Sequence, residues 1–174
     1  MLHAFNLFFN LIMGRGWKVP SFPSKVVSGQ DKDVSGGHFI AFSRAQRKDG
    51  AVSYGIAAVD FSTGVLRVFG ENAPEIIHNL LLSIPGDVVV PDRIRVDDDI
   101  SAVIDSVSNR LVSFGGRGDA FSGERLLCEH YGVPALSDLG DWSRPDVAAM
   151  GLAVTYLVDL GSRAKLRLPC RGSF

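Results

Sequence analysis

The feature that most constrains the fold of this chain is a strand-like stretch, Ser53 to Val59, whose centre contains no polar residue. At its centre stand four apolar residues in a row, Ile56-Ala57-Ala58-Val59, so that both the odd and the even positions of the strand are apolar. Since successive side chains of a strand point to opposite faces of a sheet, both faces of this strand must be covered. We therefore expect it in the interior of a sheet with packing layers on both sides.

The flanking segments predict that this strand is the middle of an antiparallel meander. His38–Ala45 has strand character, and Gly50 ends a charged hairpin tip that leads into the strand ending at Asp60. Gly64 closes the next turn, where a left-handed conformation costs glycine little. Val65–Phe69 is then the third strand.

Helical and extended patterns alternate after the meander. The order, near βββαβαβα, predicts an α/β fold with a ribonuclease-H-like mixed sheet that helices cover on both faces. The expected elements are a helix from Pro74 to Ile84, a strand at Asp87–Pro91, a helix over about 97–107, a short strand at Arg110–Phe114, a helix at about Ala120–Tyr131 and a helix from Ser143 to Leu160.

Length and charge bound the domain organisation and the partners. The chain has 174 residues and a net charge of −1, which suits one domain and argues against a stand-alone basic module that binds nucleic acid. We expect a divergent segment and linker over 1–36, one domain over 37–168 and a tail over 169–174.

The apolar stretch 1–13 is too short to span a bilayer, so no membrane association is expected. The basic residues among the first 30 support organelle targeting only weakly, and a cytoplasmic protein is expected.

The cysteines and histidines do not predict a metal site. Cys128 and Cys170 lie far apart in the sequence, and His130 follows Cys128 without a second pair of ligands. Two reduced thiols are the expected state.

Carboxylates keep one enzymatic alternative open. A nuclease of ribonuclease-H-like fold binds metal ions through clustered acids, and Asp60, Glu75 and Asp87 are available. The first strand contains no acid, so we interpret Asp60 as a turn former. The run 97–99 is interpreted as the acidic start of a helix.

Nucleotide-binding and nucleophile motifs are missing from the sequence. No glycine-rich loop ends in Lys-Ser or Lys-Thr, and the stretch Gly115–Glu124 has no lysine and is expected to be a flexible loop. No serine stands in a nucleophile-elbow pattern. We therefore predict no catalytic, cofactor-binding or metal-binding residue and no resident cofactor.

Several motifs, in order, resemble a known family. "SYGIAAVDFSTGVLRV" is similar to the signature of the connector domain, the second domain of the MutS DNA mismatch repair proteins. Its pattern, glycine-aliphatic-alanine followed by Asp-x-Ser-Thr-Gly, falls on Gly55–Gly64. "LLLSIPGDVVVPD", "LLCEHYGVPALSDLG" and "AAMGLAVTYLVDL" resemble the later helix, fold-back and closing helix of that domain. The resemblance covers about Phe39 to Leu168.

The resemblance implies a role without catalysis. In the family this domain relays conformational change between the mismatch-reading and ATPase parts and contacts a MutL-type protein. ATP, magnesium and mismatched duplex DNA belong to other domains of full-length relatives, in a nucleoid-associated setting. Residues 1–36 do not resemble the mismatch-reading domain, and we interpret Phe69-Gly70-Glu71 as a chance match to its motif. We expect a partial or truncated homologue that is not an enzyme.

Two further hypotheses stay open at this point. One is a small metal-dependent nuclease, which requires an acidic cluster at the carboxyl edge of the sheet. The other is an unrelated α/β ligand-binding module, which requires a deep apolar pocket with convergent polar groups.

Because no phosphate-binding loop is present, we predict that the pure chain neither binds nor hydrolyses ATP. Phosphate release is measured with ATP and Mg²⁺ against a matched blank. Turnover above that blank would contradict the prediction.

Overall fold

The structure is a computed structural model that describes residues 37–46, 48–70, 74–84, 86–91, 102, 111–115, 119–160 and 166–172. Segment 1–36 and the Asp97–Asp99 run lie outside the described residues, as does the helix expected over 97–107, of which only Ala102 is described as helical. The part described has an α/β fold, which confirms the expected fold class.

The described strands form a six-stranded mixed sheet in the order β5-β4-β1-β2-β3-β6. The first three strands are the predicted antiparallel meander, and β4, β5 and β6 each pair parallel to a neighbour. The strands are β1 (His38–Gln46), β2 (Val52–Asp60), β3 (Val65–Phe69), β4 (Asp87–Pro91), β5 (Leu111–Phe114) and β6 (Cys170–Arg171).

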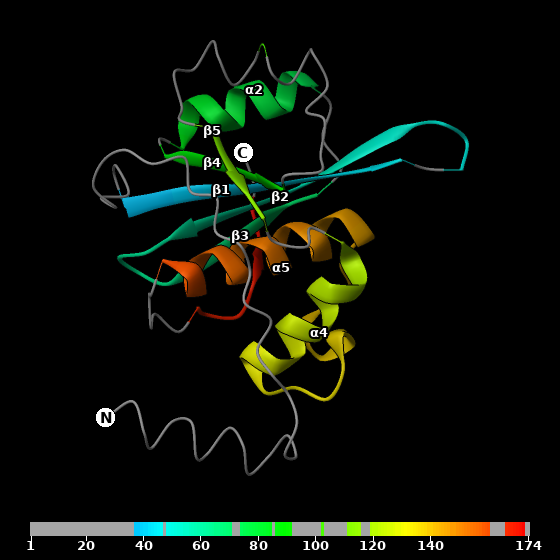
Figure 1. The fold of residues 1–174 in the computed structure, drawn as a ribbon, viewed down its shortest axis with the longest axis vertical. Coiled ribbons are helices and arrows are strands. Elements are labelled where there is room, and N and C mark those ends of the chain that lie inside the picture. Colours follow the sequence, from blue (N-terminus) through cyan, green and yellow to red (C-terminus); the bar gives the residue numbers. More distant parts are fainter. Residues whose placement is uncertain are drawn as a thin grey trace.

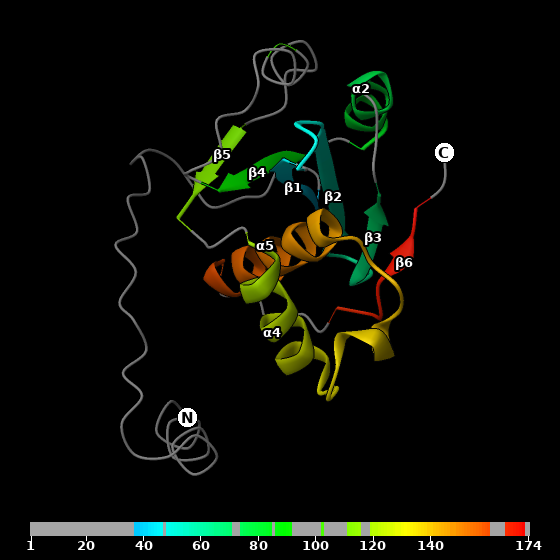
Figure 2. The ribbon, with the colours of Figure 1, turned by 90° about the vertical axis from the view of Figure 1, so that its right-hand side faces the viewer.

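Helices pack on both faces of this sheet, as the sequence predicts. Figures 1 and 2 show helices above and below the sheet, so the sheet is the middle of three layers. The helix α2 (Pro74–Ser83) covers one face, and α5 (Arg144–Asp159) covers the other with α4 (Ala120–Tyr131) packed against it. A short 3₁₀ helix, η2 (Leu136–Leu139), connects α4 to α5.

The central strand β2 contributes to two separate cores. Ala57 is fully buried in the cluster on the α5 side, together with Met150 and Leu152. Ala58 is 5% exposed in the cluster on the α2 side, together with Ile77 and Leu80. The apolar run in the middle of β2 is therefore explained by helices on both of its faces.

Glycines set how closely α5 approaches the sheet and how closely α4 approaches α5. A Cβ on Gly55 of β2 would collide with the backbone carbonyl of Pro145, in the first turn of α5. A Cβ on Gly151 would collide with the backbone of Gly123, where α5 crosses α4. Next to the first contact, the buried hydroxyl of Ser43 donates a hydrogen bond of 2.7 Å to the Pro145 carbonyl.

The ends of the helices follow from local sequence. Ser143 and Asp146 form a capping box at the start of α5, and Pro145 occupies its first turn. Asp119 caps α4, whose end is set by Gly132 at φ 67°.

The helix expected at about Ala120–Tyr131 is confirmed as α4. The overlapping expectation of a flexible loop over Gly115–Glu124 is wrong for its second half, since Asp119 caps α4 and Ala120–Glu124 are helical. The strand β6 was not expected, and it lies inside the segment interpreted as a tail. A two-residue strand is too short to produce a periodic pattern in the sequence.

The burial of β2 generates a prediction about volume. Replacing Ala57 with leucine forces three extra carbons into a closed layer, and we expect a loss of about 1–3 kcal/mol in the free energy of unfolding. The same residue at the exposed hairpin position Lys48 should change that free energy by no more than about 0.5 kcal/mol. Urea unfolding of both variants in one buffer measures the difference. If Ala57→Leu unfolds no earlier than Lys48→Leu, one face of β2 is open.

Candidate functional site

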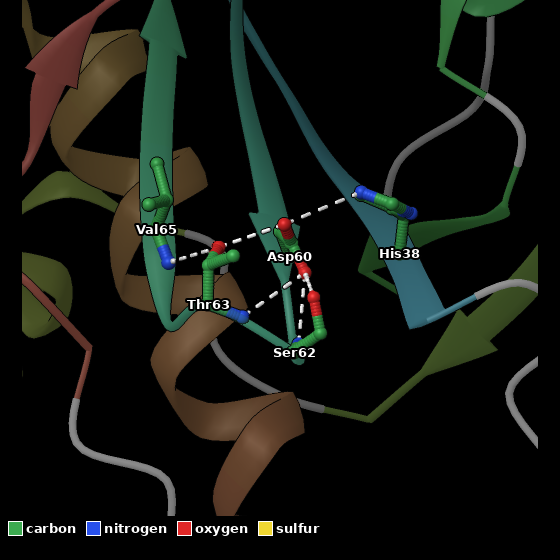
Figure 3. A network of polar contacts seen from close by, with 5 residues as sticks. All are labelled: His38, Asp60, Ser62, Thr63 and Val65. Atoms are coloured by element: carbon green, nitrogen blue, oxygen red, sulfur yellow. Dashed lines mark hydrogen bonds and ion pairs between the residues drawn. The ribbon is translucent and has the colours of Figure 1, made fainter.

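Polar side chains that the sequence analysis singled out meet in the turn after β2, shown in Figure 3. One carboxylate oxygen of Asp60, Oδ1, accepts hydrogen bonds from the backbone N–H and the hydroxyl of Ser62, at 2.8 and 2.6 Å, and from the Thr63 N–H at 3.3 Å. The other, Oδ2, accepts from the Thr63 hydroxyl at 2.7 Å and lies 3.6 Å from Nε2 of His38. Gly64, at φ 67°, closes the turn with a hydrogen bond of 2.8 Å from its N–H to the Asp60 carbonyl.

These hydrogen bonds stabilise the charged form of the Asp60 carboxylate. The Ser62 hydroxyl and then the Thr63 hydroxyl are the largest causes, and they hold the pKa of Asp60 well below its usual range. The interpretation of Asp60 as a turn former is confirmed by this geometry. A carboxylate that accepts four protein hydrogen bonds has little capacity left to bind a metal ion or to accept a proton.

Ser62, Asp60 and His38 do not form a nucleophilic triad. In such a triad the serine hydroxyl donates to the histidine, which removes its proton. Here the Ser62 hydroxyl donates to the Asp60 carboxylate instead, so no base activates it. The three residues hold the turn together.

The sheet register places the candidate nuclease acids on opposite faces. Asp87 of β4 is in register with Phe39, whose side chain lies in the core on the α5 side. Asp60 is in register with His38, one position earlier on β1, and therefore points to the α2 side. Asp60 and Asp87 lie on the two strands that neighbour β1, beside its first residues. Because their side chains point to opposite faces of the sheet, they cannot share a metal ion. The side chain of the third candidate, Glu75, is not among the parts that the structure describes. The described part of the chain contains no group of three or more potential metal ligands.

The residues Cys128, His130 and Tyr131 of α4 do not form a reactive site either. Burial, followed by the charges of Glu124 and other nearby acids, raises the pKa of the Cys128 thiol. Burial lowers the pKa of His130 and raises that of Tyr131, whose hydroxyl donates a hydrogen bond of 2.9 Å to the Arg167 carbonyl. Both cysteines are free thiols, as expected, and the raised pKa makes Cys128 a poor nucleophile.

A hollow of about 490 Å³ lies where β3 and β6 meet the start of α5. The guanidinium of Arg171 lies 5.5 Å from the centre of the Trp142 ring and donates a hydrogen bond of 2.8 Å to the Asp141 carbonyl. The sequence did not predict this hollow, because thirty positions separate Arg171 from Asp141 and no motif relates the two. The hollow is lined by Val68, Gly70, Asp141, Trp142, Ser143, Asp146, Arg171 and Gly172.

A smaller cavity of about 170 Å³ lies beside the Asp60 turn, on the α2 side. Its wall combines the cation of Arg67 with the carboxylate of Asp60 and the ring of His38. The end of α2, at Ser83, adds the partial negative charge of a helix C-terminus. Because charges of both signs line this cavity, it favours neither an anionic nor a cationic ligand.

Among the helices that the structure describes, none combines the length and the apolar character needed to cross a membrane.

Comparisons with known proteins find similar segments in DNA mismatch repair proteins. The chain is 28% identical over 136 residues to the DNA mismatch repair protein MutS of Nitrobacter winogradskyi, and 29% identical over 143 residues to that of Rhizobium meliloti. These matches cover 77% and 78% of the chain but 15% of each relative. The MutS of Cereibacter sphaeroides is 33% identical over 115 residues, which is 65% of the chain and 12% of that protein. No family model matches the chain.

The Asp60 turn generates a prediction about pH. Replacing Asp60 with asparagine removes the charge that the two hydroxyls stabilise, and we expect a loss of about 1–2 kcal/mol in unfolding free energy near pH 7. Because folding lowers the pKa of Asp60, its contribution is complete above about pH 5 and is lost as the pH falls below about 4, the unfolded value.

Urea unfolding of both proteins between neutral and acid pH measures this contribution. The difference between wild type and Asp60→Asn should shrink as the pH falls below about 4. A Ser53→Ala variant, in the same strand but outside the turn, serves as the control. A difference that stays constant with pH would show that the Asp60 charge does not stabilise the fold.

Proposed function

We propose that this chain, which is a partial homologue of the MutS DNA mismatch repair proteins, acts in mismatch repair as a non-catalytic domain of the connector type. The observation that carries the proposal is the match itself. The matches to relatives from several organisms cover about two thirds to three quarters of this chain. The same matches cover only a small fraction of the relatives' own length.

The packing supports a mechanical role for this domain. A relay between two distant sites requires a body whose elements move together. The strand β2 is closed on both faces, and α5 contacts it through the backbone at Gly55 and Pro145. Backbone-to-backbone contacts leave no side chain that can adapt, so a displacement of α5 must displace the sheet.

The proposed partners follow from the same assignment. We expect this domain to contact a MutL-type protein, and to reach mismatched duplex DNA only through other parts of a MutS-type protein. ATP and Mg²⁺ would act in those other parts. A cytoplasmic, nucleoid-associated location fits this role.

The other two hypotheses have less support. A nuclease needs carboxylates that converge, and the register directs Asp60 and Asp87 to opposite faces. A ligand-binding module needs a largely apolar pocket with a few polar groups. The hollow beside Trp142 is instead lined by Asp141, Asp146 and Arg171, groups of opposite charge.

The proposed contact with a MutL-type protein can be tested in a bacterium with intact mismatch repair. Overproduced chain should compete with the resident MutS for its partner and raise the frequency of spontaneous mutation. The matched control is Gly55→Leu, whose side chain collides with the Pro145 carbonyl and prevents α5 from packing. Equal mutation frequencies for wild type and Gly55→Leu, at equal expression, would argue against the proposed role.

We also predict that the pure chain does not distinguish mismatched from matched duplex DNA. Its net charge of −1 supplies little attraction to phosphates, and no described element resembles a mismatch-reading wedge. Competition between a G·T duplex and its matched counterpart near physiological salt measures the preference. A preference of about tenfold or more, equal to about 1.4 kcal/mol, would contradict the prediction.

A further inference from the structure

The strand β6 is short, yet it is attached at several points. Its two residues pair with Arg67 and Val68 of β3. On either side, the N–H of Arg167 donates to the Gly64 carbonyl at 2.8 Å, and the N–H of Gly172 donates to the Val68 carbonyl at 2.9 Å. So few backbone hydrogen bonds at the end of a sheet open easily, because local opening costs less than global unfolding.

The side chain of Arg171 adds a second attachment, to a different element. Its guanidinium lies over the ring of Trp142 and donates to the Asp141 carbonyl at 2.8 Å. Asp141 and Trp142 directly precede Ser143, the N-cap of α5. One exposed side chain therefore connects the last described strand to the start of the helix that covers the sheet.

The ring of Trp142 is held in place to receive this guanidinium. Its indole N–H donates a hydrogen bond of 3.0 Å to the Leu139 carbonyl, at the end of η2. The ring also packs against the core on the α5 side. An arginine that stacks on an aromatic ring gains electrostatic attraction from the ring face, and this attraction is modest where water has access.

The two attachments of the start of α5 differ in strength. Toward the sheet, Pro145 is held by the buried hydrogen bond from Ser43 and by the close approach of Gly55. Toward β6, the start of α5 is held by the exposed guanidinium of Arg171. A force on β6 would therefore break the Arg171 contact before it separates α5 from the sheet.

We propose that Arg171, Asp141 and Trp142 form a releasable latch that holds β6 against the start of α5. Closed, the latch connects β6 directly to the start of α5, in addition to the pairing of β6 with β3. Open, it leaves β6 held by that pairing and by the Tyr131–Arg167 hydrogen bond, so that β6 separates from the rest of the body more easily. The proposal deepens the proposed function and rests on it for its biological meaning, because a relay needs a defined point at which motion enters.

Hydrogen exchange of the full chain, followed by NMR, tests the latch. The amides of Arg167 and Gly172 report the opening of β6, and the amides of β2 report global unfolding. Arg171→Ala should speed exchange at the two β6 reporters by roughly three- to tenfold and leave β2 unchanged. The control is Arg125→Ala, which removes the 3.6 Å pair with Glu129 on α4 and should leave both sets unchanged.

Two outcomes of the exchange experiment would overturn the proposal. One is that, in Arg171→Ala, the exchange rates of the Arg167 and Gly172 amides stay within about twofold of the wild-type rates. An attachment of the expected strength must change these rates by more than that. The other is an equal acceleration at β2, which would assign Arg171 to the stability of the whole fold.

The Trp142 indole resonance is an independent readout. It should shift in Arg171→Ala and stay in place in Arg125→Ala, and an unmoved resonance in both variants would show that the stacking does not form in solution. The experiment uses neither DNA nor a partner protein. Its failure would therefore leave the mismatch-repair assignment standing, and failure of the mutation-frequency test would leave the latch standing.

Discussion

The backbone contact between Gly55 and Pro145 is the constraint on which the rest of this structure depends. It brings the first turn of α5 against the middle of the sheet at a distance that a Cβ would prevent. The Ser43 hydroxyl uses the same proximity to donate a hydrogen bond to the Pro145 carbonyl, and this buried hydroxyl thereby finds its partner. With its start fixed in this way, α5 covers the small residues of β2 along its length and presents Gly151 to Gly123 of α4.

Sequence reasoning recovered the parts of the fold that repeat a period or contain a strong local signal. The apolar run of β2 predicted coverage on both faces, and Ser143 with Pro145 predicted the start of α5. The relation between Arg171 and Trp142 could not be predicted, because it depends on where β6 pairs. The function of Gly55 was also hidden, since a glycine in a strand shows only that some backbone approaches closely.

The candidate site shows why residue types alone are a weak guide to chemistry. Asp60, Ser62 and His38 are the residue types of a hydrolytic triad, and Asp60 with Asp87 could suggest a metal site. The direction of one hydrogen bond decides the first question, because the Ser62 hydroxyl donates to the carboxylate. The alternation of side chains across β1 decides the second, because it places the two acids on opposite faces. Sequence favoured the turn interpretation of Asp60, and the geometry supplied the reason.

Helix α5 and the sheet should move as one body, and the most direct test is the smallest possible change at the contact between them. Gly55→Ala adds a single methyl group at the Pro145 carbonyl, where only backbone atoms could yield. Urea unfolding should show a loss of about 2–3 kcal/mol relative to wild type, at the upper end of the cost of overpacking. Ser53→Ala, two positions earlier on the same strand, should stay within about 0.5 kcal/mol. Equal stabilities for the two variants would show that α5 does not rest on β2 through its backbone, and the rigid relay would lose its physical basis.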